Sequence, residues 1–353
     1  MSTDQVLFER RGRLGVIVLN RPRNINALTP QMVEAMLAKL GEWAKDDAVR
    51  TVLMRGAGER GLCAGGDIVA IYRDMIDDGG SATAQFWARE YRLNSLISRY
   101  PKPYVAFMDG LVLGGGVGIS AHGSHRIITE RTRMGMPETT IGFVPDVGGT
   151  FLLAAATGES GTHAALTGAH LDGADALHLG LADHFVRSDS LDALATALEE
   201  EAADEAIAKF VVEPQPSSLA ADRTWIDHAY AADDVEEIVR RLRSTPVPEA
   251  AQAADSIEAK SPTALKVTLE ALRRARARDL TLEEALDVEY RIGLRFLAGH
   301  DFREGIRAQV IEKDRSPRWN PATAADVTTS MVADCFTSLG GRELGLAEGV
   351  AIG

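Results

Sequence analysis

Two glycine-rich loops contain the first residues of this chain that could take part in chemistry. One loop is Cys63–Asp67 (Cys-Ala-Gly-Gly-Asp) and the other is Leu113–Gly116 (Leu-Gly-Gly-Gly). Each follows an expected strand and leads into an expected helix, where the first backbone N–H groups have no partner and lie at the positive end of the helix. Because glycine lets a ligand atom approach the backbone, two converging N–H groups could bind a polarised carbonyl oxygen as an oxyanion hole. For either loop alone, a role in tight turns and packing is the commoner explanation.

Two carboxylates follow these loops at a short spacing. Glu138 lies in Met136-Pro-Glu-Thr, and Asp146 lies eight residues later in Pro145-Asp-Val-Gly-Gly. A carboxyl group among apolar neighbours has a raised pKa and can serve as a general base or a nucleophile. The structural alternatives are a first-turn acid for Glu138 and an N-cap for Asp146, and either residue taken alone fits these equally well.

Several other chemistries lack the residues that they need. The run Gly114–Gly118 does not have the G-x-G-x-x-G spacing, and the chain has neither a phosphate-loop Lys-Ser pair nor a G-x-S-x-G elbow. His122 and His125 have no third ligand nearby, so we expect no metal site. No serine or cysteine pairs convincingly with a histidine, and Cys63 is expected to pack rather than to react.

The elements that must position these residues alternate between strands and helices in the first half of the chain. Thr29 and Pro30 are typical of a helix start, and Asp67 can cap the helix after the first glycine loop. We expect strands at 15–20, 51–54, 104–108 and 126–129, with helices at 30–43, 68–75 and 81–99. This order predicts an α/β fold with a largely parallel sheet.

After about residue 190 the strand signal fades. We expect helices at 191–210, 232–243, 248–259, 262–277, 281–297 and 301–313. The predicted domains are therefore an α/β core at 1–190 and a helical C-terminal region at 191–353. The basic run Arg273, Arg274, Arg276 and Arg278 is expected to be a solvated helix face rather than a binding patch.

Composition and charge exclude several classes of partner. The 353 residues include 38 Lys and Arg against 51 Asp and Glu, so the net charge is −13, which disfavours nucleic-acid binding. Two cysteines give no disulfide framework and suit a reducing compartment, so we expect a cytoplasmic protein. Asp4 and Glu9 argue against a targeting peptide, and the apolar stretch Leu111–Ala121 is too short to cross a membrane.

Taken together, these motifs resemble the crotonase (enoyl-CoA hydratase/isomerase) superfamily, and within it the 3-hydroxyisobutyryl-CoA hydrolase branch. The resemblance runs from about Leu14 to about Leu339. It rests on Asn20-Arg-Pro, Asn26-Ala-Leu-Thr, Cys63-Ala-Gly-Gly-Asp-Ile, Gly114-Gly-Gly-Val-Gly, Met136-Pro-Glu-Thr, Phe143-Val-Pro-Asp-Val-Gly-Gly, Ser261-Pro-Thr-Ala-Leu-Lys, Glu289-Tyr-Arg and Gly299-His-Asp-Phe-Arg-Glu-Gly. It implies a crotonase-like spiral of ββα units with a helical C-terminal region packed on it.

The resemblance also implies roles for particular residues. The N–H groups of Gly66 and Gly115 would form the oxyanion hole for an acyl-CoA thioester, and Glu138 and Asp146 lie where the hydrolase branch keeps its catalytic acids. Glu90 matches a residue of the acyl pocket and could bind a hydroxyl of the acyl chain, although an exposed helical acid is equally compatible with its sequence context. The matched motifs further assign Asn26 and Ala64 to substrate binding.

One departure from the hydratases separates two reactions. Hydratases of the superfamily use a second glutamate at the position of Gly118, and glycine cannot transfer a proton. The resemblance therefore implies hydrolysis of a short 3-hydroxyacyl-CoA, namely 3-hydroxyisobutyryl-CoA in valine breakdown. The alternatives are an enoyl-CoA hydratase or isomerase, and a non-catalytic acyl-CoA-binding protein.

The CoA moiety is part of the substrate, and no separate cofactor is implied. Since the protein is acidic, local cations must hold the CoA phosphates. Arg21 and Arg23 are the first candidates, and Lys260 and Lys266 are further ones. The superfamily often forms trimers and hexamers, so a homo-oligomer is possible, but the helical region could also cover the acyl site within one chain.

Overall fold

The computed structural model describes residues 4–348 of the chain. The chain forms two compact units, each built from separate segments. The first, here called the sheet unit, takes in the chain up to Gly66 together with Arg89–Gly135 and Leu171–Ser218. The second, the helical unit, takes in Asp67–Ala88, Met136–His170 and the chain from Leu219 onward. The domain boundary expected at residue 190 stays a prediction.

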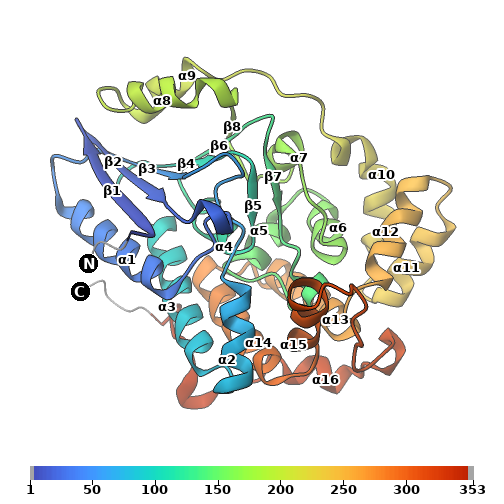
Figure 1. The fold of residues 1–353 in the computed structure, drawn as a ribbon. Helices are drawn as coiled ribbons and strands as arrows, with labels where there is room; N and C mark the ends of the chain where they lie inside the picture. The colour runs from blue at the N-terminus through green and yellow to red at the C-terminus, as the bar shows by residue number, and fades with distance from the viewer. Residues whose placement is uncertain (1–3, 349–353) are drawn as a thin grey trace. The chain divides into compact units, whose positions relative to one another are not determined.

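A six-stranded sheet forms the centre of the sheet unit (Figure 1). Its strands, in spatial order, are β1 (Val6–Arg11), β2 (Leu14–Leu19), β3 (Thr51–Gly56), β4 (Tyr104–Met108), β6 (His125–Ile128) and β8 (His184–Phe185). The hairpin pair β1 and β2 is antiparallel, and every following pair is parallel. The expected strands are confirmed. The edge strand β1 was not expected, because three of its six residues are charged.

Side chains alternate between the two faces of this sheet, as the two-residue period of a strand requires. On one face, Leu14 and Val16 pack in a buried cluster with residues of α8 (Leu191–Ala197) and α9 (Ala203–Ala208). On the other, Gly15 lies against Trp43 of α1 (Pro30–Lys45), where an added Cβ would come within 2.8 Å of the indole ring. The α1 and α8–α9 segments therefore cover opposite faces (Figure 1).

A second, smaller layer of strands carries the glycine loops. It consists of β5 (Leu111–Leu113) and β7 (Arg133–Gly135), which pair in parallel. The chain thus passes from β4 to β5 and from β6 to β7, each time from the large sheet to the small one. Two isolated parallel bridges, Cys63 with Val112 and Leu28 with Gly66, extend the small layer.

The remaining α-helices that lie wholly in the sheet unit are short. They are α4 (Gly115–Gly118) and α7 (Gly173–His178). The helix α3 (Ser81–Ser98) begins in the segment assigned to the helical unit and ends in the sheet unit. The expected helix at 191–210 is broken into α8 and α9, with Leu198–Ala202 between them.

The helical unit contains most of the α-helices in the described part of the chain. They are α2 (Ile68–Asp77), α5 (Gly149–Ala155), α6 (Ser160–Thr167), α10 (Ser218–Tyr230), α11 (Val235–Ser244), α12 (Pro248–Glu258), α13 (Pro262–Arg278), α14 (Leu282–Ala298), α15 (Asp301–Ile306) and α16 (Thr329–Asp334). The expected N-caps at Thr29 and Asp67 are confirmed, since each side chain accepts a hydrogen bond from the backbone N–H three residues later. The expected helix at 301–313 is α15 followed by a π-helical turn, Arg307–Ile311.

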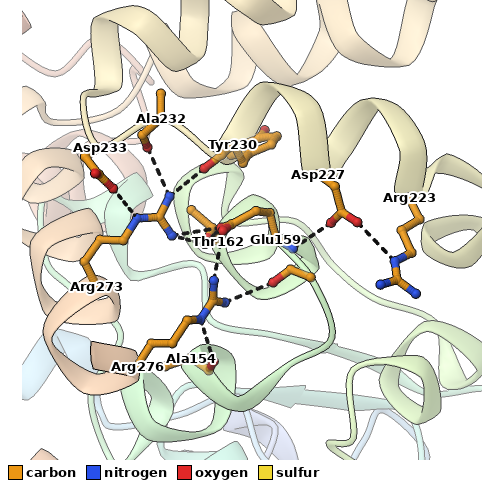
Figure 2. Close-up of polar contacts among 11 residues, drawn as sticks. Ala154, Glu159, Thr162, Arg223, Asp227, Tyr230, Ala232, Asp233, Arg273 and Arg276 are labelled. Carbon is orange, nitrogen blue, oxygen red and sulfur yellow. Dashed lines mark hydrogen bonds and ion pairs between the residues drawn. The ribbon is translucent and has the colours of Figure 1, made fainter. Parts of the chain in front are cut away.

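The basic run of α13 is a solvated face only in part: Arg276 and Arg278 are exposed as expected, whereas the prediction was wrong for Arg273, whose side chain is 19% exposed. Arg273 donates to Glu159, to Asp233 and to two backbone carbonyls, and Arg276 donates to Glu159 and to the carbonyls of Ala154 and Gly158 (Figure 2). The Arg273–Glu159 pair is largely buried. These arginines hold α13 to α6 and α10, because their donors meet carbonyls that helix ends leave without partners.

None of the helices within residues 4–348 combines the length and the apolar character needed to span a bilayer.

Candidate active site

The two glycine loops come together through the register of the small strand layer. Cys63 pairs in parallel with Val112, with hydrogen bonds of 3.1 Å from Cys63 N to Leu111 O and 2.9 Å from Leu113 N to Cys63 O. Gly66 lies three residues after Cys63, and Gly115 lies three residues after Val112. Since parallel neighbours keep their register, the two glycines emerge side by side.

The amide groups of Gly66 and Gly115 are free to bind an external acceptor. Within residues 4–348, neither N–H donates a hydrogen bond to another group. A Cβ added to Gly115 would lie 3.5 Å from the nitrogen of Gly66. Because a Cβ lies about 2.5 Å from its own nitrogen, the two nitrogens are within about 6 Å of each other. This upper limit is compatible with two donors that share one oxygen atom.

Glu90 approaches this pair of amides from α3. Its side chain is only 2% exposed, and its Oε1 lies 2.5 Å from the position of an added Cβ on Gly115. The exposed helical acid that its sequence also allowed is therefore excluded. A side chain at residue 115 would therefore displace the Glu90 carboxyl group from its position beside the two amides.

Asn94 is a polar residue that the sequence reasoning missed. It lies one helical turn after Glu90, on the same face of α3, and is completely buried. Neither its amide oxygen nor its amide nitrogen has a hydrogen-bond partner within the described part of the chain. The sequence signal that could have found it is the polar pair at positions i and i+4 of a buried helix face.

Asn26 lies beside the first glycine loop and Ala64 lies within it, and both donate hydrogen bonds to backbone carbonyls. The Asn26 side chain donates to the carbonyls of Gly61 (3.2 Å) and Leu62 (3.1 Å) and accepts from Arg21 N. The N–H of Ala64 donates to Ile25 O at 2.9 Å. These contacts fix the first glycine loop. They also use the N–H groups of the Asn26 side chain, so none is left to bind a substrate.

The helical unit brings Glu138 and Asp146 together. Each is 7% exposed. Glu138 opens a 3₁₀ turn, Glu138–Ile141, so the first-turn interpretation holds locally. The N-cap interpretation of Asp146 was wrong: the N-cap of α5 is Gly148, which has no side chain, and Asp146 lies in the preceding turn.

The environment of Glu138 favours its protonated form. Burial raises the pKa of this carboxyl well above the ordinary value, and the nearby charges of Asp146 and Glu289 raise it further. The oxygen Oε2 of Glu138 is buried and has no hydrogen-bond partner within residues 4–348. A carboxyl group in this state can hold a proton near neutral pH, release it to a base, and attack or activate water once ionised.

Glu289 is a third buried carboxylate that the sequence reasoning quoted only as part of a motif. It lies on α14 and accepts hydrogen bonds from the backbone N–H groups of Gly148 (2.7 Å) and Thr150 (2.9 Å) and from the Thr150 hydroxyl. Burial raises its pKa to about 8, against the effect of these donors, and Asp146 contributes to the increase. No local sequence signal marks it, because a helical glutamate is usually exposed.

The four candidate cations for the CoA phosphates differ in their availability. Arg21 is half-buried and donates to the carbonyl of Ala27, whereas Arg23 is exposed. Lys260 donates to Thr140 Oγ1 at 2.7 Å and burial lowers its pKa, and Lys266 forms an ion pair with Glu236 at 2.8 Å. Lys260 lines a cavity of about 350 Å³ between α11, α12 and α13.

No metal centre accompanies the acids: across residues 4–348, no group of three or more His, Cys, Asp or Glu residues could hold an ion.

Comparison with known proteins decides the family. The sequence model of the enoyl-CoA hydratase/isomerase family matches residues 14–336. The chain belongs to this family. The 3-hydroxyisobutyryl-CoA hydrolase of Danio rerio is 40% identical to it, over 97% of this chain and 92% of that protein. The mitochondrial enzyme of the same name from Homo sapiens is 37% identical, over 97% of this chain and 91% of that protein.

Solved structures of the family establish the fold as the crotonase fold. A structure titled as a carnitinyl-CoA dehydratase from Mycobacterium thermoresistibile has a TM-score of 0.93 and is 50% identical, over 97% of this chain and 98% of that one. A structure titled as an enoyl-CoA hydratase from Rhodobacter sphaeroides has a TM-score of 0.91 and is 40% identical, over 96% and 99%. The passage of this chain from the large sheet to the small one, followed by a helix, is the ββα unit expected for this family.

Proposed function

We propose that this protein hydrolyses a short 3-hydroxyacyl-CoA thioester, with 3-hydroxyisobutyryl-CoA as the substrate. The observation that carries the proposal is a pair of acceptor-free backbone N–H groups, at Gly66 and Gly115, in a chain that also holds Glu138 buried beside Asp146. Curated relatives across nearly the whole chain length are named for this reaction. The products are free CoA and 3-hydroxyisobutyrate, a step of valine breakdown.

The first step is polarisation of the thioester. The carbonyl oxygen accepts hydrogen bonds from the N–H groups of Gly66 and Gly115, and negative charge collects on that oxygen as the carbonyl carbon becomes tetrahedral. Donors fixed in the backbone need no reorganisation at that moment. The loss of one such donor typically costs about 10²–10³ in rate.

Glu138 acts on the carbonyl carbon by one of two routes. In the first, its carboxylate attacks the carbon and the C–S bond breaks, so that an anhydride forms and is then cleaved by water. In the second, it removes a proton from a water molecule that attacks directly. In both routes Asp146 orients the water or the 3-hydroxyl group. In the anhydride route the carboxylate pair holds one proton before the attack and passes it to the leaving CoA thiolate, and the water that cleaves the anhydride returns a proton to the pair. In the general-base route the proton removed from water is passed to the thiolate. After a single turnover in ¹⁸O-water, ¹⁸O in the Glu138 side chain identifies the anhydride route, because it arises only when water attacks the Glu138 carbonyl carbon of an anhydride.

Glu90 gives a physical reason for a 3-hydroxy substituent. Its buried carboxylate, beside Gly115, can accept a hydrogen bond from a hydroxyl of the acyl chain. A substrate without that hydroxyl cannot form this hydrogen bond, which gives the site a basis for discrimination. Asn26 and Ala64 support this pocket by holding the loop.

The test is thiol release from a panel of acyl-CoAs. We expect turnover of 3-hydroxyisobutyryl-CoA and a loss of about 10²–10⁴ in kcat for Glu138→Gln, the range typical of a general base. Glu249→Gln is the control, because Glu249 is also a first-turn acid, at the start of α12, and is exposed. If the wild-type protein releases no thiol from any member of the panel, the proposal fails.

The second candidate is hydration or dehydration of an enoyl-CoA. It is favoured by the two solved structures at 50% and 40% identity, which are named as a carnitinyl-CoA dehydratase and an enoyl-CoA hydratase. Against it stands Gly118, a buried residue of α4 that cannot supply the second proton-transfer group. Loss of the enoyl absorbance of crotonyl-CoA without thiol release would favour hydration. Tight acyl-CoA binding with neither reaction, unaffected by Glu138→Gln, would indicate a binding protein.

The cellular location and the oligomeric state of the protein are two further proposals. We propose a cytoplasmic site of action on the strength of two buried, unpaired cysteines, Cys63 and Cys335; the curated relatives are described as mitochondrial. A homo-oligomer is compatible with the family. Fractionation of cells and the mass of the purified protein in solution test the two statements.

A further inference from the structure

The turn that carries Asp146 is held by one carboxylate from a distant part of the chain. Glu289, on α14, accepts hydrogen bonds from Gly148 N at 2.7 Å, Thr150 N at 2.9 Å and the Thr150 hydroxyl. Glu289 is completely buried. Its two oxygens therefore satisfy backbone donors at the start of α5 that the short helix cannot satisfy itself.

This turn is strained in a way that needs an anchor. Val147, directly after Asp146, has φ of +53°, and Gly148 has φ of +82°. A β-branched residue at positive φ is an outlier that costs of the order of 1–3 kcal/mol and persists only where the surroundings fix it. The hydrogen bonds to Glu289 fix Val147 from the next residue, Gly148, and from Thr150, three residues after Val147.

The other charged groups around Glu289 are few. Asp146 and Glu138 act on it electrostatically. Of the helices that pack on α14, α5 has no titratable residue. The helix α15 carries Asp301, which is bound by Ser261 and by the backbone of Asn320, and also Arg303 and Glu304, of which Glu304 is paired with Arg307. The segment 81–88, which contacts α14 through Tyr290, contains no titratable residue either.

We infer that Glu289 is a positioning residue for hydrolysis: by pinning the Gly148–Thr150 backbone it sets the direction in which Asp146 points. The inference rests on the proposed function and deepens it. Glu289 itself touches no substrate. A carboxyl group is suited to the task because both of its oxygens can accept a backbone N–H, and when it carries a proton the Thr150 hydroxyl can turn to accept that hydrogen. A glutamine would turn an N–H₂ group toward one of the N–H donors and leave it without an acceptor.

The experiment compares a matched pair of buried acids on the same helix. Asp287, two residues before Glu289, also accepts two backbone N–H groups, those of Leu346 (2.9 Å) and Ala347 (3.0 Å), but on a C-terminal loop without catalytic candidates. Glu289→Gln and Asp287→Asn therefore each remove one buried backbone anchor from α14. Urea unfolding and the kinetics of thiol release from 3-hydroxyisobutyryl-CoA are measured for both.

We expect both variants to lose stability, and only Glu289→Gln to lose activity. A small displacement of a catalytic group can cost about 10²-fold, so we expect a fall of that order in kcat with little change in KM. Thr150→Val, which removes one of the three donors, should give a smaller fall, and Thr150→Ser, which keeps all three, should restore the wild-type kcat. If Glu289→Gln does not fold, the pair of Thr150 variants decides the question.

The outcomes separate the two proposals. A wild-type protein without thiol release overturns the proposed function and this inference together. A wild-type protein that hydrolyses its substrate, with equal kcat losses for Glu289→Gln and Asp287→Asn or with kcat unmoved by Thr150→Val and Glu289→Gln, overturns only the role of Glu289.

Discussion

Replacing Gly115 by alanine tests the carbonyl-binding pair of amides most directly. The backbone at Gly115 has no positive φ, so alanine can adopt it without strain. Its methyl group, however, would lie 2.5 Å from Glu90 Oε1 and 3.1 Å from Leu28 Cδ1, and 3.5 Å from the nitrogen of Gly66. The methyl would therefore stand between the two donors and force the Glu90 carboxylate away.

The distances around the added methyl group determine how large the effects on stability and on kcat should be. A carboxylate oxygen and a methyl carbon normally stay about 3.3–3.6 Å apart, so Glu90 must retreat by roughly 1 Å. Overpacking of this kind costs about 1–3 kcal/mol of folding stability. Because the substrate oxygen can no longer reach both amides, we expect kcat to fall by about 10²–10³.

The assay is thiol release with a chromogenic thiol reagent, together with urea unfolding. The protein's own thiols should react slowly, because both are buried and burial raises the pKa of Cys63 to about 12 and that of Cys335 to about 11. Gly41→Ala is the control: Gly41 lies in α1 with nothing within 4 Å of an added Cβ, so it should gain about 1 kcal/mol of stability with kcat unchanged. A folded Gly115→Ala protein whose kcat stays within a few-fold of wild type would refute the oxyanion-hole assignment.

Three further predictions follow from the contacts and charges. First, Glu289 has a folded-state pKa raised to about 8. Between about pH 4.5 and 8 the folded state therefore binds more protons than the unfolded state. The free energy of unfolding of the wild-type protein should then fall as pH rises, by up to about 1.4 kcal/mol per pH unit relative to Glu289→Gln. Urea unfolding at three pH values checks this, and a difference that does not depend on pH contradicts it. Second, Arg273→Ala should cost about 3 kcal/mol because it leaves the largely buried Glu159 without one of its partners, whereas Arg240→Ala, on an exposed pair, should cost far less; equal losses would argue against the network of Figure 2. Third, Arg23→Ala should raise KM for acyl-CoA and weaken its salt dependence with kcat unchanged, and an unaltered KM removes Arg23 from the phosphate site.

Much of the fold was predictable because local signals agree with the final structure. The Thr29-Pro30 pair and the Asp67 cap mark helix starts, and the apolar runs at β2, β3 and β4 mark buried parallel strands. The edge strand β1 escaped because half of its residues are charged and face solvent, which removes the apolar pattern.

The candidate site was predictable only in part, for a physical reason. Gly66, Gly115, Glu138 and Asp146 lie in motifs whose spacing suggests chemistry, but their mutual distances depend on pairing across the chain. Glu289 lies 141 residues from Gly148, whose N–H it accepts, so no window of sequence contains the interaction. Arg273 of α13 was misjudged in the same way, because its partner Glu159 lies more than a hundred residues away.

The pairing of Cys63 with Val112 has a consequence for how this protein can be altered. The groups that would grip the substrate oxygen belong to the main chain, so no replacement of a side chain deletes them, and among the coded residues proline alone lacks the hydrogen. What the sequence must preserve instead is a spacing of three residues, from Cys63 to Gly66 and from Val112 to Gly115. Inserting or removing a single residue in either segment would shift one donor relative to the other, and no substitution reproduces that change of register.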